Sequence, residues 1–312
     1  MKPVITVTAN PALDLTINAK GWQRGVVNRG ESMTVTPGGK GVSVAINLME
    51  SGVDALVTGW MGEGNDIHFT REFRMLGMRD EFIRIPGDIR RNVKIIDQGE
   101  TTDFNLPGEV VPEKCQQALI NFLDRSVPNA SMLVMGGSLP PSVDKDFYAK
   151  MVKRYRGKCD YIVVDTSDKA LIETMNADVL PDIIKPNIHE LQTLVGRAIE
   201  SDEDILAAAR EFLARGMKMV VVSMGERGAW FVKPDEALHA TPPKVKVAST
   251  VGAGDAMVAG VVRGILNGRD LEHIARTATA FSAGNITVTG VQLPSQERIE
   301  ELKAKVVIRR AD

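Results

Sequence analysis

TVGAGDAMVAG, residues 250–260, decides the fold of this chain, because small residues lead directly into an apolar helical pattern. Glycines allow backbone N–H groups to face a ligand, and the helix that follows adds the positive end of its dipole. Asp255 stands at the junction, where a base would meet an incoming hydroxyl. The pattern indicates a phosphoryl-transfer site, although a glycine-rich turn before a helix is also typical of ordinary strand-to-helix packing.

Three other segments place glycine or polar residues where one predicted element gives way to the next. PGGKG (37–41) opens a second helical pattern, GGSLP (136–140) follows an apolar strand, and KPNIHE (185–190) follows another. In this order and at these positions, the four segments resemble those of the ribokinase-like carbohydrate kinases of the phosphofructokinase B type. The resemblance covers nearly the whole chain.

Two further motifs are similar to the hexose-phosphate branch of that family. TANPALD (8–14) resembles the T-x-N-P-x-x-D opening of the branch, and RRNVK (90–94) resembles its T-R-x-N-V-K strand. One residue departs from the pattern, since Ser43 replaces the asparagine of the common G-G-K-G-x-N motif. The shorter side chain lacks an amide donor, which leaves the sugar preference within the branch open.

Composition agrees with an enzyme that acts on a small molecule. The chain has 312 residues, 44% hydrophobic and 25% charged, and its length is compatible with one large core or two modest ones. The formal net charge is −2 and the basic residues are scattered, which argues against nucleic acid or an anionic membrane as a partner. Cys115 and Cys159 form no C-x-x-C pair and the four histidines form no H-E-x-x-H motif, so we expect no disulfide and no structural metal.

The N-terminus leads directly into the strand-like segment VITVT (4–8), without a charged and apolar leader. No apolar run approaches the ~18 residues that a membrane span needs. We therefore expect a cytoplasmic protein.

Apolar strand-like runs alternate with helical patterns along the chain. This alternation predicts an α/β fold in which a mainly parallel central sheet is covered by helices on both faces, a three-layer α/β/α arrangement. The expected strands are 55–61, 132–135, 161–164, 183–184 and 219–223, and the expected helices are 42–49, 113–123, 147–155, 204–213 and 256–266.

Two stretches, at about 15–36 and 82–106, interrupt this alternation with short alternating segments and no helix. We expect them to form a small antiparallel sheet. The family resemblance implies that this sheet is a lid over the sugar and the contact of a homodimer; from the residues alone it could equally be an extra hairpin on the main sheet. Since no repeat, low-complexity tract or long linker occurs, residues 1–312 are expected to form a single domain with the lid as insertions.

The chemistry expected at residues 252–255 is phosphoryl transfer from ATP. Because this reaction passes through a loose transition state, the enzyme mainly aligns the attacking oxygen and neutralises charge on the γ-phosphoryl group. The N–H groups of Gly252, Ala253 and Gly254 would form an anion hole. The helix N-terminus should lower the pKa of Asp255, which would then orient the hydroxyl and take its proton late. The alternative for Asp255 is a plain helix cap.

The nucleotide must be held without a Walker A or G-x-G-x-x-G sequence, since the chain contains neither. Candidates are Ser223, Gly225 and Gly228 after a strand, where a tight hairpin turn is the alternative. Lys185 would approach a nucleotide phosphate, or is simply a solvated strand end. Asn187 and Glu190 resemble the family's N-x-x-E element, which positions Mg²⁺ through water. A capping box explains the same spacing, and the two interpretations are compatible.

The sugar side is assigned mainly from the resemblance. It implies that Asp14 binds sugar hydroxyls, a role that suits an acceptor-only carboxylate, whereas a capping or turn aspartate is the alternative. Lys40 and Arg90 would together neutralise a sugar phosphate, with Arg90 binding it through two N–H groups. The other predicted substrate contacts are Gly38, Gly39, Ser43 and Ser138.

These observations predict an ATP- and Mg²⁺-dependent kinase of a ketohexose phosphate. D-Fructose 1-phosphate, which would give fructose 1,6-bisphosphate, is the first choice of substrate. Tagatose 6-phosphate and fructose 6-phosphate are alternatives, because all three present an anionic ketohexose to the same base. Tagatose differs from fructose at one stereocentre, a distinction of hydrogen-bond placement that motifs do not reveal. A protein of another class, a non-catalytic sensor of sugar phosphates, is disfavoured because a pure binder needs no base.

Overall fold

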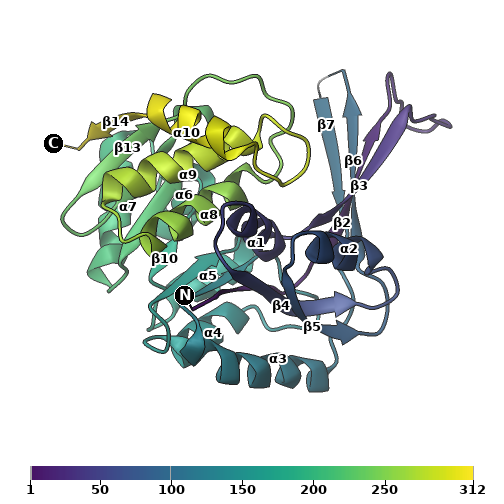
Figure 1. Ribbon diagram of the computed structural model, residues 1–312, viewed down its shortest axis with the longest axis horizontal. Coiled ribbons are helices and arrows are strands. Elements are labelled where there is room, and N and C mark those ends of the chain that lie inside the picture. Colours follow the sequence, from purple (N-terminus) through teal and green to yellow (C-terminus); the bar gives the residue numbers. More distant parts are fainter. Residues whose placement is uncertain (1, 99, 312) are drawn as a thin grey trace.

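The computed structural model describes residues 2–98 and 100–311, and within them a ten-stranded sheet forms the centre of the molecule (Figure 1). All pairings from β5 to β11 are parallel, and β12 to β14 continue the sheet in antiparallel fashion. In sheet order the strands are β14 (Val307–Arg310), β13 (Ala237–Thr241), β12 (Ala229–Val232), β11 (Met219–Ser223), β10 (Ile183–Ile184), β9 (Tyr161–Asp165), β8 (Met132–Gly136), β1 (Val4–Thr8), β4 (Ala55–Gly62) and β5 (Arg79–Ile85).

Helices cover both faces of this sheet, because alternate strand residues are buried on opposite sides. Val134 and Val163 pack in one apolar cluster, whereas Leu133 and Val164 pack in another on the opposite face. The predicted three-layer α/β/α fold is confirmed. One layer contains α1 (Lys40–Glu50), α2 (Ile67–Met75), α8 (Ala253–Leu266), α9 (Leu271–Asn285) and α10 (Gln296–Lys305). The other contains α3 (Glu113–Ser126), α4 (Phe147–Tyr155), α5 (Asp168–Asn176), α6 (Ile188–Val195) and α7 (Asp202–Ala214). Two short 3₁₀ turns, η1 (Val127–Asn129) and η2 (Gly225–Arg227), complete the connections.

No helix in residues 2–98 and 100–311 combines the length and the apolar character that crossing a membrane would require.

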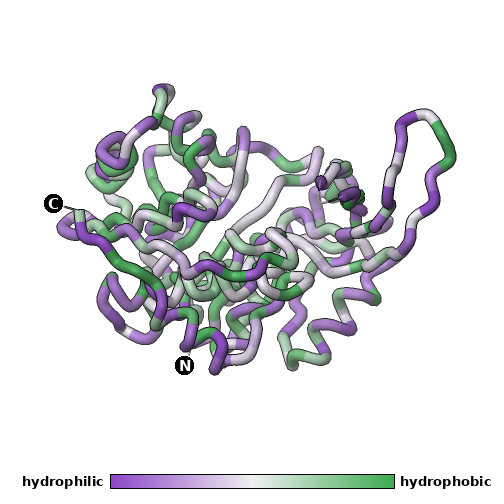
Figure 2. Tube along the Cα trace, turned by 90° about the horizontal axis from the view of Figure 1, so that it is seen from above, coloured by the Kyte–Doolittle hydropathy of each residue, from purple (hydrophilic) through white to green (hydrophobic). Residues whose placement is uncertain are grey.

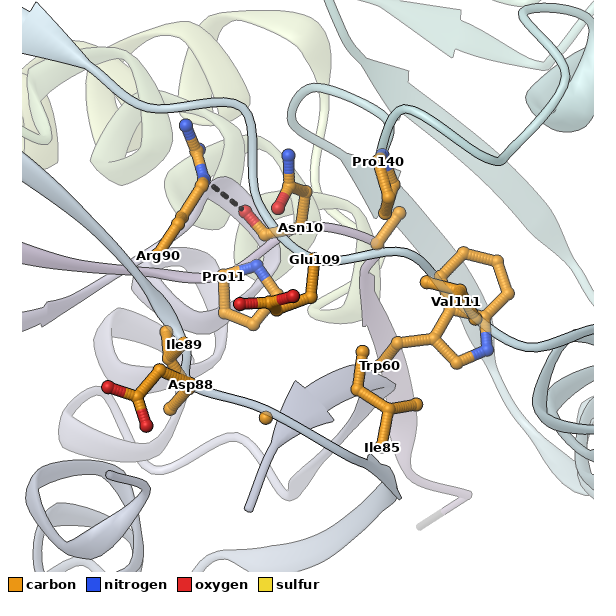
Figure 3. A pocket seen from close by; sticks show the side chains of 12 residues that line it. Asn10, Pro11, Trp60, Ile85, Asp88, Ile89, Arg90, Glu109, Val111 and Pro140 are labelled. Carbon is orange, nitrogen blue, oxygen red and sulfur yellow. Dashed lines mark hydrogen bonds between the residues drawn. The ribbon is translucent and has the colours of Figure 1, made fainter. Parts of the chain in front are cut away.

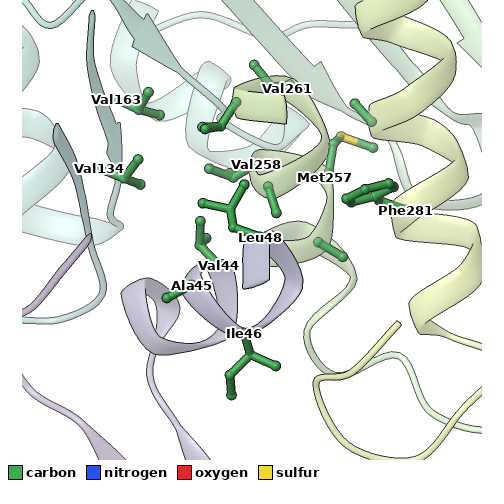
Figure 4. Packing of buried hydrophobic residues seen from close by; sticks show 14 of the residues in the cluster. Val44, Ala45, Ile46, Leu48, Val134, Val163, Met257, Val258, Val261 and Phe281 are labelled. Atoms are coloured by element: carbon green, nitrogen blue, oxygen red, sulfur yellow. The ribbon is translucent and has the colours of Figure 1, made fainter. Parts of the chain in front are cut away.

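Helix α8 packs against both α1 and α9 over the centre of the sheet (Figure 4). Val44 and Leu48 of α1 and Val258 of α8 belong to one buried cluster with Phe281 of α9. Gly260 allows α8 and α9 to approach closely, because a Cβ atom there would lie 2.5 Å from the Cα of Ala278. This packing fixes the direction of α8, and therefore the position of its glycine-rich start.

A separate four-stranded sheet projects from one end of the body (Figure 1), and the connection between β2 and β3 extends farthest from it, as seen also from above (Figure 2). Its order is β3-β2-β6-β7, in which the β2–β3 and β6–β7 pairs are antiparallel and the central β2–β6 pair is parallel. The extra-hairpin alternative is therefore wrong. The strands are β2 (Ala12–Asn18), β3 (Ser32–Gly38), β6 (Arg90–Asp97) and β7 (Glu100–Asn105).

The bounds of this small sheet differ from those expected. The first insertion begins earlier, since β2 starts at Ala12. The second begins later, because Phe82 lies in β5, which pairs with β4 in the main sheet, and the small sheet resumes only at Arg90. Strand β5 is an edge strand of the main sheet, so its mixed charged and apolar residues resemble those of the small sheet.

Candidate active site

The predicted segments meet at the carboxyl ends of the parallel strands. Thr8, Gly136 and Asp165 are register partners at the ends of β1, β8 and β9. Strands β4 and β5 follow β1 on one side of the sheet, and β9 to β14 follow β8 on the other, so the strand order reverses between β1 and β8. In open α/β sheets, ligands bind outside the carboxyl ends of the strands at such a switch point. At the same edge, Asn187 beyond β10 forms a bridge with Ser223, the last residue of β11.

Two lysines and two aspartates form a buried charge cluster at this edge. The Nζ atom of Lys40 lies 3.0 Å from Asp165 Oδ2 and 3.5 Å from Asp255 Oδ1, and Lys185 Nζ lies 3.6 Å from Asp165 Oδ1. The side chains of Asp165 and Lys185 are 5% and 8% exposed, compared with 34% for Lys40. Asp165 was not predicted from the sequence, although a carboxylate at the end of an apolar parallel strand is a recognisable signal.

Burial and charge act in opposite directions on the pKa values of this cluster. Burial raises the pKa of Asp255, and the attraction of Lys40 only partly offsets it, so the expected lowering by the helix N-terminus was wrong. For Asp165, burial also raises the pKa, but Lys185 and Lys40 outweigh it and the pKa lies below its ordinary value. Burial lowers the pKa of Lys40, yet Asp165 and Asp255 outweigh it and the pKa rises.

The start of α8 presents backbone N–H groups beside this cluster. Gly252 is the N-cap residue with φ 85°, and the first helical hydrogen bond runs from the Ala256 N–H to Gly252 O, at 2.8 Å. The N–H groups of Ala253 and Gly254 therefore precede the intrahelical ladder. A Cβ atom on Gly254 would lie 3.2 Å from Lys185 Nζ, which places that ammonium group directly at the helix start. The cap is Gly252 and the Asp255 carboxylate pairs with Lys40, so the plain-cap alternative for Asp255 is wrong.

Ser43 lies on α1 next to this carboxylate. Its hydroxyl donates to Gly39 O at 3.2 Å, and its proximity to Asp255 lowers the pKa of that carboxyl. The residue that departs from the family pattern therefore lies close to the predicted base.

Asp14 lies within β2 of the small sheet, which excludes the capping and turn alternatives. Asn92 Nδ2 donates a hydrogen bond to Asp14 Oδ1 at 2.8 Å. Gly38 lies under the same carboxylate, since a Cβ atom there would be 2.2 Å from Asp14 Oδ2. Burial raises the pKa of Asp14, and the Asn92 hydrogen bond opposes this change.

Arg90 and Ser138 are brought together by Asn10, which the sequence analysis did not assign to the site. The Arg90 Nε group donates to Asn10 O at 3.3 Å and Nη1 donates to Leu106 O at 2.9 Å, while Asn10 Nδ2 donates to Ser138 Oγ at 3.3 Å. Burial lowers the pKa of Arg90. Figure 3 shows the adjoining pocket with Arg90 directed toward Asn10. Other residues of its lining include Pro11, Asp88, Glu109 and Pro140.

The structure separates the two cations that were expected to act together. Lys40 pairs with Asp165 and Asp255, whereas Arg90 binds backbone oxygens and Asn92, so they share no partner. Gly39 has φ 124°, and a Cβ atom there would lie 2.7 Å from Thr8 Cγ2. Close packing of α1 on β1 thus explains this glycine without a ligand.

On the nucleotide side, Asn187 and Glu190 form the capping box. The Asn187 side chain accepts from the Glu190 N–H at 2.9 Å, and Glu190 Oε2 accepts from the Asn187 N–H at 2.8 Å. The Glu190 charge contributes to the raised pKa of Lys40, so this carboxylate lies near enough to the cluster to act on it electrostatically. In the part of the chain that the structure describes, no three His, Cys, Asp or Glu side chains gather to hold a metal ion.

The segment 223–228 connects β11 to β12 as a hairpin, with Ser223 paired to Ala229. Gly225 and Gly228 have φ values of 62° and 90°. A Cβ atom on Gly228 would lie 2.0 Å from Ala240 O, so β13 requires glycine there. The hairpin interpretation is confirmed, and nucleotide contact by these residues remains a prediction.

Comparison with known proteins shows that residues 7–298 match the pfkB family of carbohydrate kinases. The chain belongs to this family. The kinase is 38% identical to 1-phosphofructokinase of Rhodobacter capsulatus, over 98% of this chain and 97% of the relative, and 35% identical to 1-phosphofructokinase of Escherichia coli, over 97% of each chain. Its structure resembles phosphofructokinase-2 of Escherichia coli in complex with substrates and products, with a TM-score of 0.89, 27% identity and coverage of 97% and 98% of the two chains. The resemblance inferred from the sequence motifs is confirmed, and the chain is an ATP-dependent sugar-phosphate kinase.

Proposed function

We propose that this kinase converts D-fructose 1-phosphate and ATP to fructose 1,6-bisphosphate and ADP. The observation that carries the proposal is the Asp255 carboxylate, which lies at the glycine-rich start of α8 and pairs with Lys40, while Lys185 lies beside the neighbouring Gly254. Relatives named 1-phosphofructokinase, which align over nearly the full length, support the choice of sugar. In the reaction the free terminal hydroxyl oxygen bonds to the γ-phosphorus, the bond from that phosphorus to the ADP oxygen breaks, and the hydroxyl proton passes to Asp255.

The residues of the charge cluster divide this work. Asp255 orients the hydroxyl and accepts its proton, for which a raised pKa is an advantage. The N–H groups of Gly252, Ala253 and Gly254, together with Lys185, stabilise charge on the transferred group. Asp165 holds Lys185 in place.

ATP and Mg²⁺ fit the donors at the nucleotide side. A capping box uses one Glu190 oxygen, and the other is available to a water of a magnesium ion, which usually keeps several waters. Since no cluster of three acidic, His or Cys ligands occurs in residues 2–98 and 100–311, we infer that nucleotide oxygens supply the remaining ligands. Bound Mg²⁺ would neutralise phosphate charge. Lys185, Asn187, Ser223, Gly225 and Gly228 line the proposed nucleotide side.

The sugar phosphate is proposed to lie between the small sheet and the cluster. Asp14, oriented by Asn92, would accept hydrogen bonds from sugar hydroxyls over Gly38 and Gly39. Arg90 donates to protein acceptors through Nε and Nη1, which leaves its Nη2 group for a phosphate. Ser138 and Ser43 would complete the contacts.

The test is initial-rate ADP release with Mg-ATP and each of four sugars, compared as kcat/KM. We expect the kcat/KM of fructose 1-phosphate to exceed those of tagatose 6-phosphate and fructose 6-phosphate by at least about tenfold, because those two carry the phosphate at the other end of the ketose. Unphosphorylated fructose is the control for the phosphate contacts. A preference for another ketose phosphate would make that sugar the substrate in place of fructose 1-phosphate. Thermal stabilisation by a sugar phosphate without any ADP release would instead indicate a non-catalytic sensor.

We also propose a homodimer formed through the small sheet. One face of that sheet carries Met33 and Phe104, which are 58% and 51% exposed, and Val27 in the β2–β3 connection is 92% exposed. Apolar surface of this kind is typical of a protein contact. We expect light scattering at micromolar concentration to give the mass of a dimer.

The double variant Met33→Glu with Phe104→Glu should shift this mass to that of a monomer. Val307→Glu, which changes an equally exposed residue on β14 of the main sheet, is the matched control and should remain dimeric. A monomeric wild-type protein would refute the dimer.

A further inference from the structure

We propose that Lys40 is a specificity-determining residue that blocks the base until the phosphate of the sugar draws it away, so that water and unphosphorylated sugars are poor acceptors. The inference rests on the proposed function, since it assigns Asp255 as the base. It goes further by giving Lys40 two successive partners, first the two aspartates and then the sugar phosphate.

The ion pairs of the free enzyme place Lys40 against the base. Its Nζ atom lies 3.5 Å from Asp255 Oδ1 and 3.0 Å from Asp165 Oδ2. An ammonium group that forms an ion pair with one oxygen of a carboxylate competes with a hydroxyl or a water for that oxygen. In this arrangement Asp255 is therefore only partly available to accept a proton from a hydroxyl or a water.

Of the two lysines in the cluster, Lys40 is the one that can leave. Its side chain is 34% exposed, whereas that of Lys185 is 8% exposed and lies against Gly254 at the start of α8. Lys40 is the first residue of α1, and its long flexible stem allows the ammonium group to move without the helix.

Departure of Lys40 would free Asp255 selectively. Asp165 would keep Lys185 at 3.6 Å, so the more deeply buried carboxylate is not left unpaired. Asp255 has no second lysine within salt-bridge distance among the described residues, so its carboxylate would become available to the substrate hydroxyl. The two lysines thus have different tasks. The buried Lys185 neutralises Asp165, and the more exposed Lys40 controls access to Asp255.

A sugar phosphate is suited to draw Lys40 away. Lys40 follows Gly38 by two residues, and Gly38 lies under the Asp14 carboxylate that is proposed to bind the sugar. A phosphate dianion in that region would compete with Asp255 for the ammonium group, which acts as a point charge for phosphate. ATP is bound in every case, so the sugar phosphate is the charge by which the acceptors differ; fructose and water lack it and meet a base that is still paired.

The test measures ATP hydrolysis without sugar in the wild-type enzyme, Lys40→Met and Lys40→Arg. In hydrolysis a water oxygen bonds to the γ-phosphorus, ADP leaves, and Asp255 takes the proton. We expect Lys40→Met to raise the hydrolysis rate about 5- to 100-fold, the size of an ordinary coupling between two groups. Lys40→Arg should keep the low rate. Structural damage would lower the rate, so a rise is specific to the proposed block.

The same variants are then assayed with fructose 1-phosphate and fructose. Lys40→Met should lower the ratio of their kcat/KM values about tenfold or more, because the phosphate loses a ligand and the base no longer depends on it. Lys218→Met is the matched control: Lys218 Nζ pairs with buried Asp182 at 3.0 Å, at the opposite end of β10, and its loss should change neither measurement.

A hydrolysis rate in Lys40→Met equal to or below that of the wild type would overturn the block and make Lys40 part of phosphoryl transfer itself. Failure of the proposed function has a different signature, since the wild-type enzyme would then turn over none of the ketose phosphates.

Discussion

Asp255→Asn is expected to lower kcat about 1000-fold, within the range for loss of a general base, while the dissociation constants of ATP and fructose 1-phosphate change by less than about fivefold. The amide has nearly the same shape as the carboxylate but cannot take the hydroxyl proton. Calorimetric titration of both ligands and stopped-flow measurement of product formation check the two halves of this result.

Asp270→Asn is the matched control, because Asp270 caps α9 through a 2.8 Å hydrogen bond from the His273 N–H, and asparagine caps a helix as well as aspartate does. It should have wild-type activity. If Asp255→Asn is equally active, the Asp255 carboxylate serves only as the ion-pair partner of Lys40 and the assignment of the base is wrong.

The pH dependence provides an independent check on the same residue. Burial raises the pKa of Asp255, and the base must be deprotonated to act. Activity should therefore be lost as the pH falls through a value above the ordinary aspartate pKa of about 3.9. The acid limb of kcat/KM against pH reports this pKa in the free enzyme.

Asp165→Asn should produce the second large effect, on both stability and activity. The change removes the charge that faces two lysines, one of them almost fully buried, and breaking a buried ion pair from one side costs about 3 kcal/mol in the free energy of unfolding. Because Lys185 would then lose its anchor at the anion hole, kcat/KM should fall about 100-fold. Urea denaturation and steady-state kinetics measure the two quantities.

Asp182→Asn separates these effects. Asp182 is buried, is paired with Lys218 and Arg156, and lies before β10 at the end of the strand away from the site. It should show a comparable loss of stability with unchanged kinetics. Equal losses of activity in both variants would indicate that Asp165 acts only through the fold.

The stability difference between wild type and Asp165→Asn should also depend on pH. The lysines hold the pKa of Asp165 below its ordinary value, so its contribution is complete above the unfolded-state pKa of about 3.9 and is lost as the pH falls toward the folded-state pKa. The two denaturation curves should therefore converge below about pH 4. A difference that grows on acidification would contradict the ion-pair explanation.

The main sheet was predictable because its central strands are buried on both faces and read as uninterrupted apolar runs, as at β8, β9 and β11. Strand β5 was not, because an edge strand carries charges, and RDEFIRI is half exposed. Its membership depends on pairing with β4, a long-range contact that no local pattern encodes.

The site residues that belong to sequence motifs were predictable, whereas those that join the site only through tertiary contacts were not. Gly252, Asp255 and Lys185 stand in recognisable segments, and the structure brings all three together. Asp165 belongs to no motif; it acquires its role from the register that places it beside Gly136. The raised pKa of Asp255 was missed because burial, which dominates it, is a property of the assembled protein.

The small sheet is joined to the body by four crossings of the chain, before β2, after β3, before β6 and after β7. Asn10 binds Arg90 and the carbonyl oxygen of Pro107, and Arg90 also binds the carbonyl oxygen of Leu106. Since Gly39 packs against Pro11 as well, the four crossings contact one another. The parallel β2–β6 pair locks the two halves of the sheet together. Any movement of the small sheet relative to the body would therefore have to be centred on the contacts of Asn10 and Arg90. A phosphate bound by Arg90 would therefore lie at the junction of the small sheet with the body and not at the tip of the sheet.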